Sequence, residues 1–99
     1  MKVVISQPMK GLTEDQIREN RSQIVKALEA EGYTILETIF NFNLPNSITH
    51  QPVYYLGESL KKLAEADVVY FMKGWENARG CVIEHETCIH YGIPTIEEQ

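Results

Sequence analysis

The chain has few of the features that are typical of nucleic-acid-binding, membrane and secreted proteins. Its 9 lysines and arginines are outnumbered by 14 aspartates and glutamates, for a formal charge of −5, so it lacks the basic excess that binding to long DNA or RNA demands. No apolar run approaches the roughly 20 residues that span a bilayer, and the amino-terminal apolar segment is too short for the core of a signal peptide. The composition therefore predicts a cytoplasmic protein with neither a nucleic-acid polymer nor a membrane as partner.

Cysteine is also scarce. Cys81 and Cys88 stand seven residues apart, which on one helix is roughly 10 Å and beyond the roughly 7 Å limit between Cα atoms for a disulfide. We therefore expect two reduced packing residues. Glu86 and His90 would share a helix face, but the histidines show no zinc-binding spacing, and we predict no metal site.

What is present suits one small domain covering residues 1–99. No repeat, linker or low-complexity segment divides the chain. On folding, a domain of this size buries about 60% of the surface of its unfolded chain. Self-association would bury more of that surface. Size alone thus makes a homo-oligomer plausible.

The amino-terminal part predicts a strand, a loop and a helix. A β-branched run over Lys2–Ser6 ends at a loop over residues 7–12. Thr13 and Gln16 have the spacing of a capping box that would start a helix, and Gly32 stands where a left-handed residue would end it. The expected apolar stripe of this helix consists of Ile17, Ile24, Val25 and Leu28.

The rest of the chain continues the alternation. We expect a strand over residues 33–38, an irregular connection over 39–52, a helix with an apolar side, a buried strand over 68–72, a helix over 80–91 and a short strand over 94–96. This order predicts a flavodoxin-like three-layer α/β/α sandwich with a four-stranded parallel sheet in the order 2-1-3-4. In that order, the loops after Ser6 and Met72 face each other across a crevice.

Glu84 is the residue of chemical interest at this rim. It lies near the start of the last predicted helix, where unpaired backbone N–H groups and the helix dipole favour an ionised carboxylate. Such a carboxylate can attack an electron-poor sugar carbon, as in retaining glycoside chemistry, which passes through a covalent glycosyl ester. Acids near helix starts are also common simply as dipole partners, and that interpretation stays open.

Other residues at the same rim could hold a ligand. Gly74 and Gly80 allow close approach of a backbone to a ligand, and Trp75 could stack on a base or seal an interface. Three cations fall on these loops and could hold a phosphate, although each could equally be a solvated surface charge: Lys10, Lys73 and Arg79.

Three segments match motifs that occur together in one superfamily. Residues 5–11, Ile-Ser-Gln-Pro-Met-Lys-Gly, are similar to a loop with the pattern Ser-Gly-Pro-Met-Thr-Gly. Residues 74–84, Gly-Trp-Glu-Asn-Ala-Arg-Gly-Cys-Val-Ile-Glu, are similar to Gly-Trp-x-x-Ser-x-Gly-Ala-x-x-Glu, and Gly-Ile-Pro follows at residues 92–94 in place of a Gly-Lys-Pro. With these segments the chain resembles the nucleoside 2-deoxyribosyltransferase-like superfamily, and within it a small bacterial and phage branch.

The resemblance implies that Glu84 is the catalytic nucleophile in cleavage of the N-glycosidic bond of a deoxynucleoside or its 5′-monophosphate, with transfer to another base or to water. It implies no metal or organic cofactor, and a homodimer or larger assembly. Together with the rim position, it assigns to the substrate pocket the residues Ser6, Gln7, Pro8, Met9, Lys10, Gly11, Gly74, Trp75, Ala78, Arg79 and Gly80.

Two positions differ from the superfamily's better-studied enzymes and leave alternatives open. Ser59 stands where those enzymes have an aspartate, and Ala78 where they have an acid or serine. General acid-base help is typically worth about 100-fold to 10,000-fold, so either Glu58 or Glu76 substitutes or the domain is a catalytically silent nucleotide-binding or sensing module. A third possibility is a protein-interaction domain with an apolar patch made of Trp75, Phe40, Phe42 and Tyr54.

Overall fold

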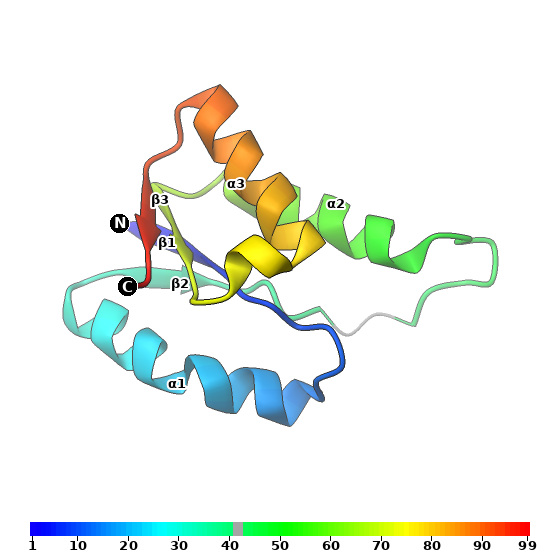
Figure 1. Cartoon of the computed structure of the whole chain (residues 1–99), viewed down its shortest axis with the longest axis horizontal. Helices are drawn as coiled ribbons and strands as arrows, with labels where there is room; N and C mark the ends of the chain where they lie inside the picture. The colour runs from blue at the N-terminus through cyan, green and yellow to red at the C-terminus, as the bar shows by residue number, and fades with distance from the viewer. Residues whose placement is uncertain (41–42) are drawn as a thin grey trace.

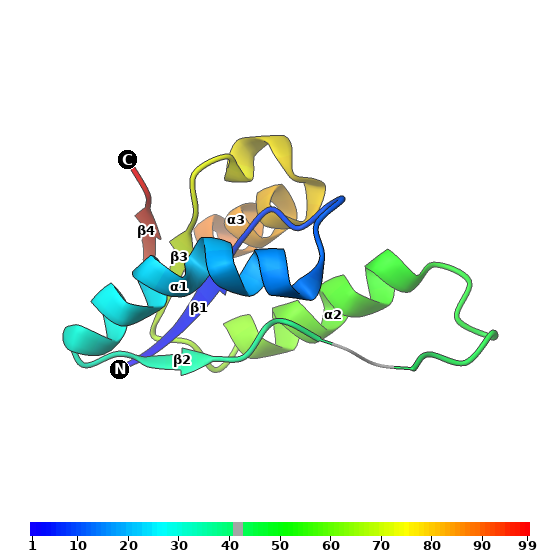
Figure 2. The ribbon, with the colours of Figure 1, turned by 90° about the horizontal axis from the view of Figure 1, so that it is seen from below.

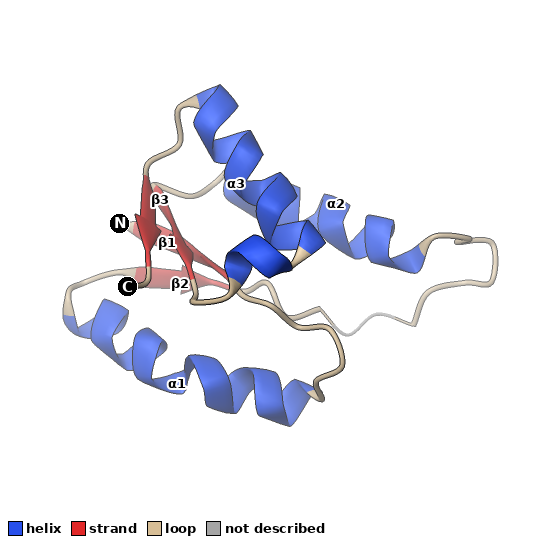
Figure 3. Cartoon of the chain, viewed as in Figure 1, coloured by secondary structure: helices blue, strands red, loops and turns tan. Residues whose placement is uncertain are grey.

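A computed structural model of the chain describes residues 1–40 and 43–99. Within them, four strands form a parallel sheet in the order β2-β1-β3-β4, and three α-helices and one short 3-10 helix connect them (Figures 1 and 3). This confirms the predicted flavodoxin-like order. The elements are β1 (Lys2–Ser6), α1 (Glu14–Ala30), β2 (Thr34–Leu36), α2 (Gln51–Leu63), β3 (Val68–Phe71), η1 (Trp75–Asn77), α3 (Arg79–Tyr91) and β4 (Thr95–Glu97).

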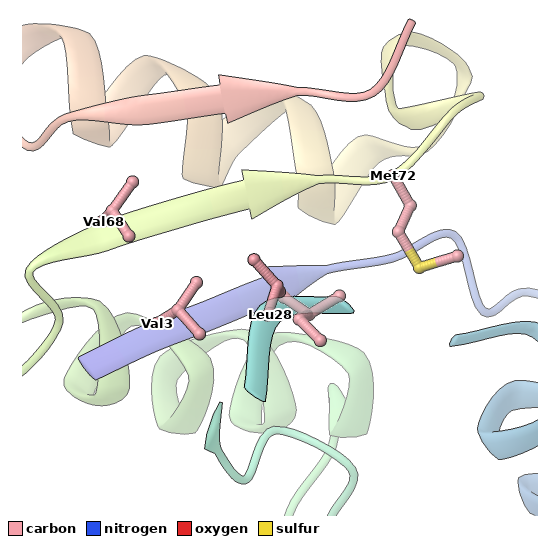
Figure 4. Packing of buried hydrophobic residues seen from close by; sticks show 5 residues of the cluster. Val3, Leu28, Val68 and Met72 are labelled. Carbon is pink, nitrogen blue, oxygen red and sulfur yellow. The ribbon is translucent and has the colours of Figure 1, made fainter. Parts of the chain in front are cut away.

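The helices cover the sheet from both sides, with α1 on one face and α2 and α3 on the other (Figures 1 and 2). Successive strand residues point to opposite faces, so the two central strands feed two separate clusters. The cluster towards α1 contains Val3, Ile5, Leu28, Val68 and Met72 (Figure 4). The cluster towards α2 and α3 contains Val4, Leu63, Val69, Phe71 and Cys88.

The two central strands end together. Their pairing runs from Val3 opposite Val68 to Ser6 opposite Phe71, and the Met72 N–H then donates to the Ser6 carbonyl at 2.9 Å. The chain therefore leaves β1 and β3 at the same edge of the sheet, and Figure 4 shows both strands ending on that side. This is the edge at which a parallel sheet places ligands.

Helix α1 has both ends that the sequence predicts. The Thr13 hydroxyl accepts from the Gln16 N–H at 3.1 Å, and the Gln16 side chain accepts from the Thr13 N–H at 2.9 Å, which is a complete capping box. At the other end Gly32 has φ +91°, and the Tyr33 N–H donates back to the Leu28 carbonyl at 3.0 Å. This ending needs a residue in the left-handed conformation after the last turn, and glycine adopts that conformation without a penalty from a Cβ.

The structure also corrects some boundaries. Strand β2 covers only Thr34–Leu36, whereas a strand over residues 33–38 was expected, and η1 forms inside the predicted loop before α3. Helix α2 begins at Gln51, inside the expected irregular connection, and has Pro52 in its first turn, where a missing N–H costs nothing. No helix of the described segments is long and apolar enough to cross a membrane.

Candidate functional site

The candidate site is built around the side chain of Glu84. The Ser6 hydroxyl, at the end of β1, donates a hydrogen bond to Glu84 Oε1 at 2.7 Å. Both residues are buried, with exposed fractions of 2% for Ser6 and 7% for Glu84. The structure therefore brings together the predicted nucleophile and the first residue of the predicted pocket, which are 78 positions apart in the sequence. Their functional roles stay predictions.

The ionisation of Glu84 does not follow from the helix dipole. Helix α3 begins at Arg79, which makes Glu84 its sixth residue, and the dipole effect fades within the first turn. Burial dominates and raises the pKa of the Glu84 carboxyl, while the Ser6 hydrogen bond lowers it by less. Removing water disfavours the charged form, so Ser6 is what supports the carboxylate.

Two thiols share the surroundings of Glu84. Burial, with an added contribution from the charge of Glu84, raises the pKa of Cys81 and of Cys88 to about 11 each. Both cysteines are buried and free, which agrees with the prediction of reduced packing residues. Since the thiolate is the reactive form, these side chains act near neutral pH as apolar walls that strengthen the desolvation of Glu84.

The loops that leave β1 and β3 touch near the site. A Cβ placed on Gly74 would lie 3.8 Å from Pro8 Cγ, and Gly74 has φ +91°, a left-handed conformation that favours glycine. By contrast, a Cβ on Gly80 would meet nothing within 4 Å. Gly80 is therefore not required by its backbone, and its open side is compatible with the close approach of a ligand to the start of α3.

Gln7 does not face the Glu84 side of the sheet. Its side-chain N–H donates to the Ile17 carbonyl at 2.9 Å, and its carbonyl oxygen accepts from Arg21 Nε at 2.7 Å. Both ends of the amide are thus engaged with α1. Gln7 therefore joins the first loop to that helix, and its role in the substrate pocket stays a prediction.

Arg21 is the buried charged residue that the sequence analysis missed. Its side chain is only 4% exposed, and desolvation lowers its pKa to about 10. Nη2 is the one buried side-chain polar atom without a partner in residues 1–40 and 43–99. The available signal was its position on the apolar stripe of α1, four residues after Ile17 and seven before Leu28, since residues at these spacings share a helix face.

The three predicted phosphate-binding cations are exposed, and one of them, Arg79, faces away from Glu84. Lys10, Lys73 and Arg79 are all exposed, and the backbone N–H of Lys73 donates to Glu98 Oε1 at 2.7 Å. Arg79 precedes Glu84 by five residues on α3, which turns it roughly 140° around the helix. It lines a shallow hollow on the outer side of α3 with Glu76, Asn77, Val82 and Ile83.

Trp75 is packed against neighbouring rings. It stacks on His85 with ring centroids 4.1 Å apart and an interplanar angle of 18°, and it tilts against Phe71 at 5.5 Å. His85 Nε2 in turn lies 2.6 Å from Glu97 Oε1 on β4. One face of the Trp75 indole is therefore occupied by protein, which leaves less of the ring for stacking on a base.

The remaining predicted residues lie as follows. Pro8 and Met9 are half-buried in the first loop, Gly11 is exposed in its turn, and Ala78 is the residue before α3. Of the proposed replacements for the missing acid, Glu58 is paired with Lys61 at 3.1 Å and Glu76 is exposed in η1.

The structure describes the proposed apolar patch only in part, and its role stays a prediction. Phe40 is half-buried, Tyr54 packs edge-on against Tyr55 at 6.2 Å, and Phe42 lies outside the described residues. In the part of the chain that the structure covers, no three His, Cys, Asp or Glu side chains gather as metal ligands.

The fold and this geometry define a small flavodoxin-like α/β domain with a buried, serine-bonded carboxyl at the carboxyl edge of its sheet. Over residues 1–97 the chain matches the family model described as "Domain of unknown function (DUF4406)", and it belongs to that family. No curated protein and no solved structure gives a match.

Proposed function

We propose that this domain cleaves the N-glycosidic bond of a small deoxynucleoside or nucleoside 5′-monophosphate, with Glu84 as nucleophile. The observation that carries the proposal is the 2.7 Å hydrogen bond from Ser6 to the buried Glu84 carboxyl, at the sheet edge where ligands bind in such folds. Its further support is the resemblance of residues 5–11 and 74–84 to motifs of the nucleoside 2-deoxyribosyltransferase-like superfamily, whose nucleophile Glu84 would match.

The chemistry follows from a positioned carboxylate. Glu84 attacks the anomeric carbon of the deoxyribose, the bond from that carbon to the base nitrogen breaks, and a glycosyl ester remains on the enzyme. The base leaves with the bonding electron pair and takes up a proton from water, and water or a second base then displaces Glu84 and gives up its own proton to solvent. The reaction needs no metal or organic cofactor.

The burial of Glu84 gives this mechanism a pH signature. Its raised pKa means that the ionised nucleophile accumulates at higher pH than for an exposed glutamate, so the acid limb of the rate profile shifts upward. Ser6 partly counters this shift, because a hydrogen bond to the charged form favours ionisation. Gly80 and the exposed Lys10 are the proposed neighbours of sugar and phosphate, whereas Arg79 faces away from a pocket built from one chain.

A catalytically silent nucleotide-binding or sensing module is the second candidate. The specific observation in its favour is the lack of an obvious acid-base partner for the leaving base. Ser59 and Ala78 carry no carboxyl, and Glu58 is engaged by Lys61. A binding site can tolerate this loss, but turnover would lose about two to four orders of magnitude.

One assay separates the two candidates. Purified protein is incubated with deoxynucleosides and their 5′-monophosphates, with and without a second base as acceptor, and free base is followed by chromatography. We expect release that disappears in Glu84→Gln and persists in the matched control Glu65→Gln, which changes an exposed glutamate in the turn after α2.

Three other results would contradict this expectation. Ligand binding without any free base would establish the sensing module and exclude the enzyme. Base release that survives Glu84→Gln would remove Glu84 as nucleophile, and a lack of both binding and release would reject the nucleotide site altogether.

A further inference from the structure

Helix α3 has a second set of regularly spaced residues, on the side that faces away from the sheet. Cys81, Glu84 and Cys88 are its buried residues. Residues three and four apart share a helix face, and on the opposite side this spacing gives a stripe that we call the outer stripe: Arg79, Val82, Ile83, Glu86 and His90. Ile83 is 44% exposed there, which leaves a sizeable apolar side chain in contact with water.

The outer stripe is hollowed on both sides of its apolar centre. Val82 and Ile83 line two shallow depressions. One of them includes Arg79 and the other Glu86. An apolar pair is thus flanked by a cation towards the start of the helix and an anion towards its end, the arrangement of apolar centre and polar rim that interfaces have.

The charges of the outer stripe lack strong partners among the residues that the structure describes. Arg79 makes no ion pair with any residue that the structure describes, and Glu86 contacts only its neighbour His90, at 3.3 Å, in a pair with both side chains well exposed. Exposed pairs of this kind contribute little. Both charges are therefore available to a partner at small cost.

We infer that the outer stripe binds a second copy of this chain, with the two α3 helices packed antiparallel around a two-fold axis between Val82 and Ile83. Arg79 and Glu86 lie equally far from that axis, in opposite directions along the helix. The symmetry therefore brings Arg79 of each copy to Glu86 of the other, and it forms the ion pair twice.

The stripe complements itself, which is the requirement for an isologous two-fold interface. Val82 and Ile83 of each copy then cover those of the other, and their burial supplies the apolar contribution to association. Tyr91, which is 81% exposed, borders the hollow that contains Glu86. Since Glu84 lies on the sheet side of α3, this interface is independent of the proposed reaction.

A charge-swap series tests the interface. The mass in solution is measured by sedimentation over a concentration series for the unchanged chain, Arg79→Glu, Glu86→Arg and the double variant. We expect twice the chain mass of 11.4 kDa for the unchanged protein. Each single variant faces two like-charge contacts and should weaken dimerisation at least about tenfold, whereas the double variant should recover to within about threefold of the original.

A second pair of variants separates the apolar centre from general effects. Ile83→Glu places a charge at the axis and should abolish the dimer, whereas Val53→Glu makes an equivalent change at an exposed residue of α2 and should leave it intact. Circular dichroism verifies that each variant is folded. A monomer at all concentrations up to about 1 mM, a double variant that fails to recover, or a dimer that tolerates Ile83→Glu would overturn the inference.

Discussion

At the end of β1, each face of the sheet holds one buried charge, of opposite sign, through a hydrogen bond to a neutral side chain. Ser6 reaches towards α3 and donates to the buried Glu84, whereas the next residue, Gln7, reaches towards α1 and accepts from the buried Arg21. Burial is the largest cause of both pKa shifts, which raise the pKa of Glu84 and lower that of Arg21. Two buried charges are thus held apart by the sheet, and each is bonded to a neutral side chain.

The two buried charges differ in how completely their surroundings close them off. Arg21 is bonded to Gln7, whose amide also binds the Ile17 carbonyl, so this side is closed by a network that joins the first loop to α1. Glu84 has a hydroxyl partner and lies at the sheet edge near the open side of Gly80. The α1 side therefore fastens the loop, and the α3 side is the candidate for binding and catalysis.

The largest effect is expected on the α1 side. Gln7→Ala removes the acceptor of Arg21 and leaves a buried guanidinium and the Ile17 carbonyl short of partners, at a cost of about 3 kcal/mol in the free energy of unfolding. Urea denaturation measures this cost. The matched control is Gln23→Ala on the exposed side of α1, and a Gln7→Ala variant as stable as the control would refute the fastening role.

Ser6→Ala should have the next largest effect. It deprives the buried Glu84 of its donor, which costs about 2 kcal/mol near neutral pH and raises the pKa of Glu84 further. The loss should shrink in acid, where the carboxyl is neutral in both proteins. Denaturation at neutral and acidic pH tests this, with the exposed Ser47→Ala as control. A cost that does not change with pH would mean that Ser6 does not stabilise the charge.

Glu84→Gln should act in the opposite direction and more weakly. The pKa of Glu84 is raised in the folded state above its ordinary value of 4.5, so its neutral form favours folding below that value and the benefit is lost as the pH rises through the folded-state pKa. The glutamine variant should therefore be more stable than the original near neutral pH and lose this advantage below about pH 4.5.

Thermal unfolding across that pH range shows the difference for Glu84→Gln. If the glutamine variant were less stable than the original protein at neutral pH, the burial argument for the raised pKa would be wrong.

The smallest stability change is expected at Gly80. Its added Cβ has free space, and alanine is a better helix former than glycine by up to about 1 kcal/mol, so Gly80→Ala should stabilise α3 slightly. If a ligand approaches there, the same variant should weaken nucleotide binding at least about tenfold, as measured by calorimetry. Unchanged affinity would place the ligand elsewhere along the rim.

The sequence predicted the parts of the fold that depend on local patterns. The spacing of Thr13 and Gln16 was sufficient for the capping box, and the alternation of strands and helices was sufficient for the sheet order. The meeting of Ser6 and Glu84 followed from the same topology, because parallel strands end at one edge. The burial of Glu84 did not follow, since it depends on the packing of Cys81 and Cys88 around it.

What the sequence could not provide were contacts set by three-dimensional packing. The hydrogen bond between Gln7 and Arg21 joins a loop to a helix face, and no local sequence pattern predicts it. The position of Arg79 depends on the phase of α3, which is fixed by where η1 ends and the helix begins. Because of this phase, Arg79, the predicted phosphate contact, lies on the outer stripe.

The pairing of β1 with β3 has a consequence for how the site can adapt. Ser6 is a paired residue of the central strand, and its carbonyl also receives the Met72 N–H at 2.9 Å. Its hydroxyl can rotate, but its backbone cannot shift without opening the middle of the sheet. Adjustment to the proposed substrate would therefore fall to the segments that follow on either side, residues 8–12 and 73–78.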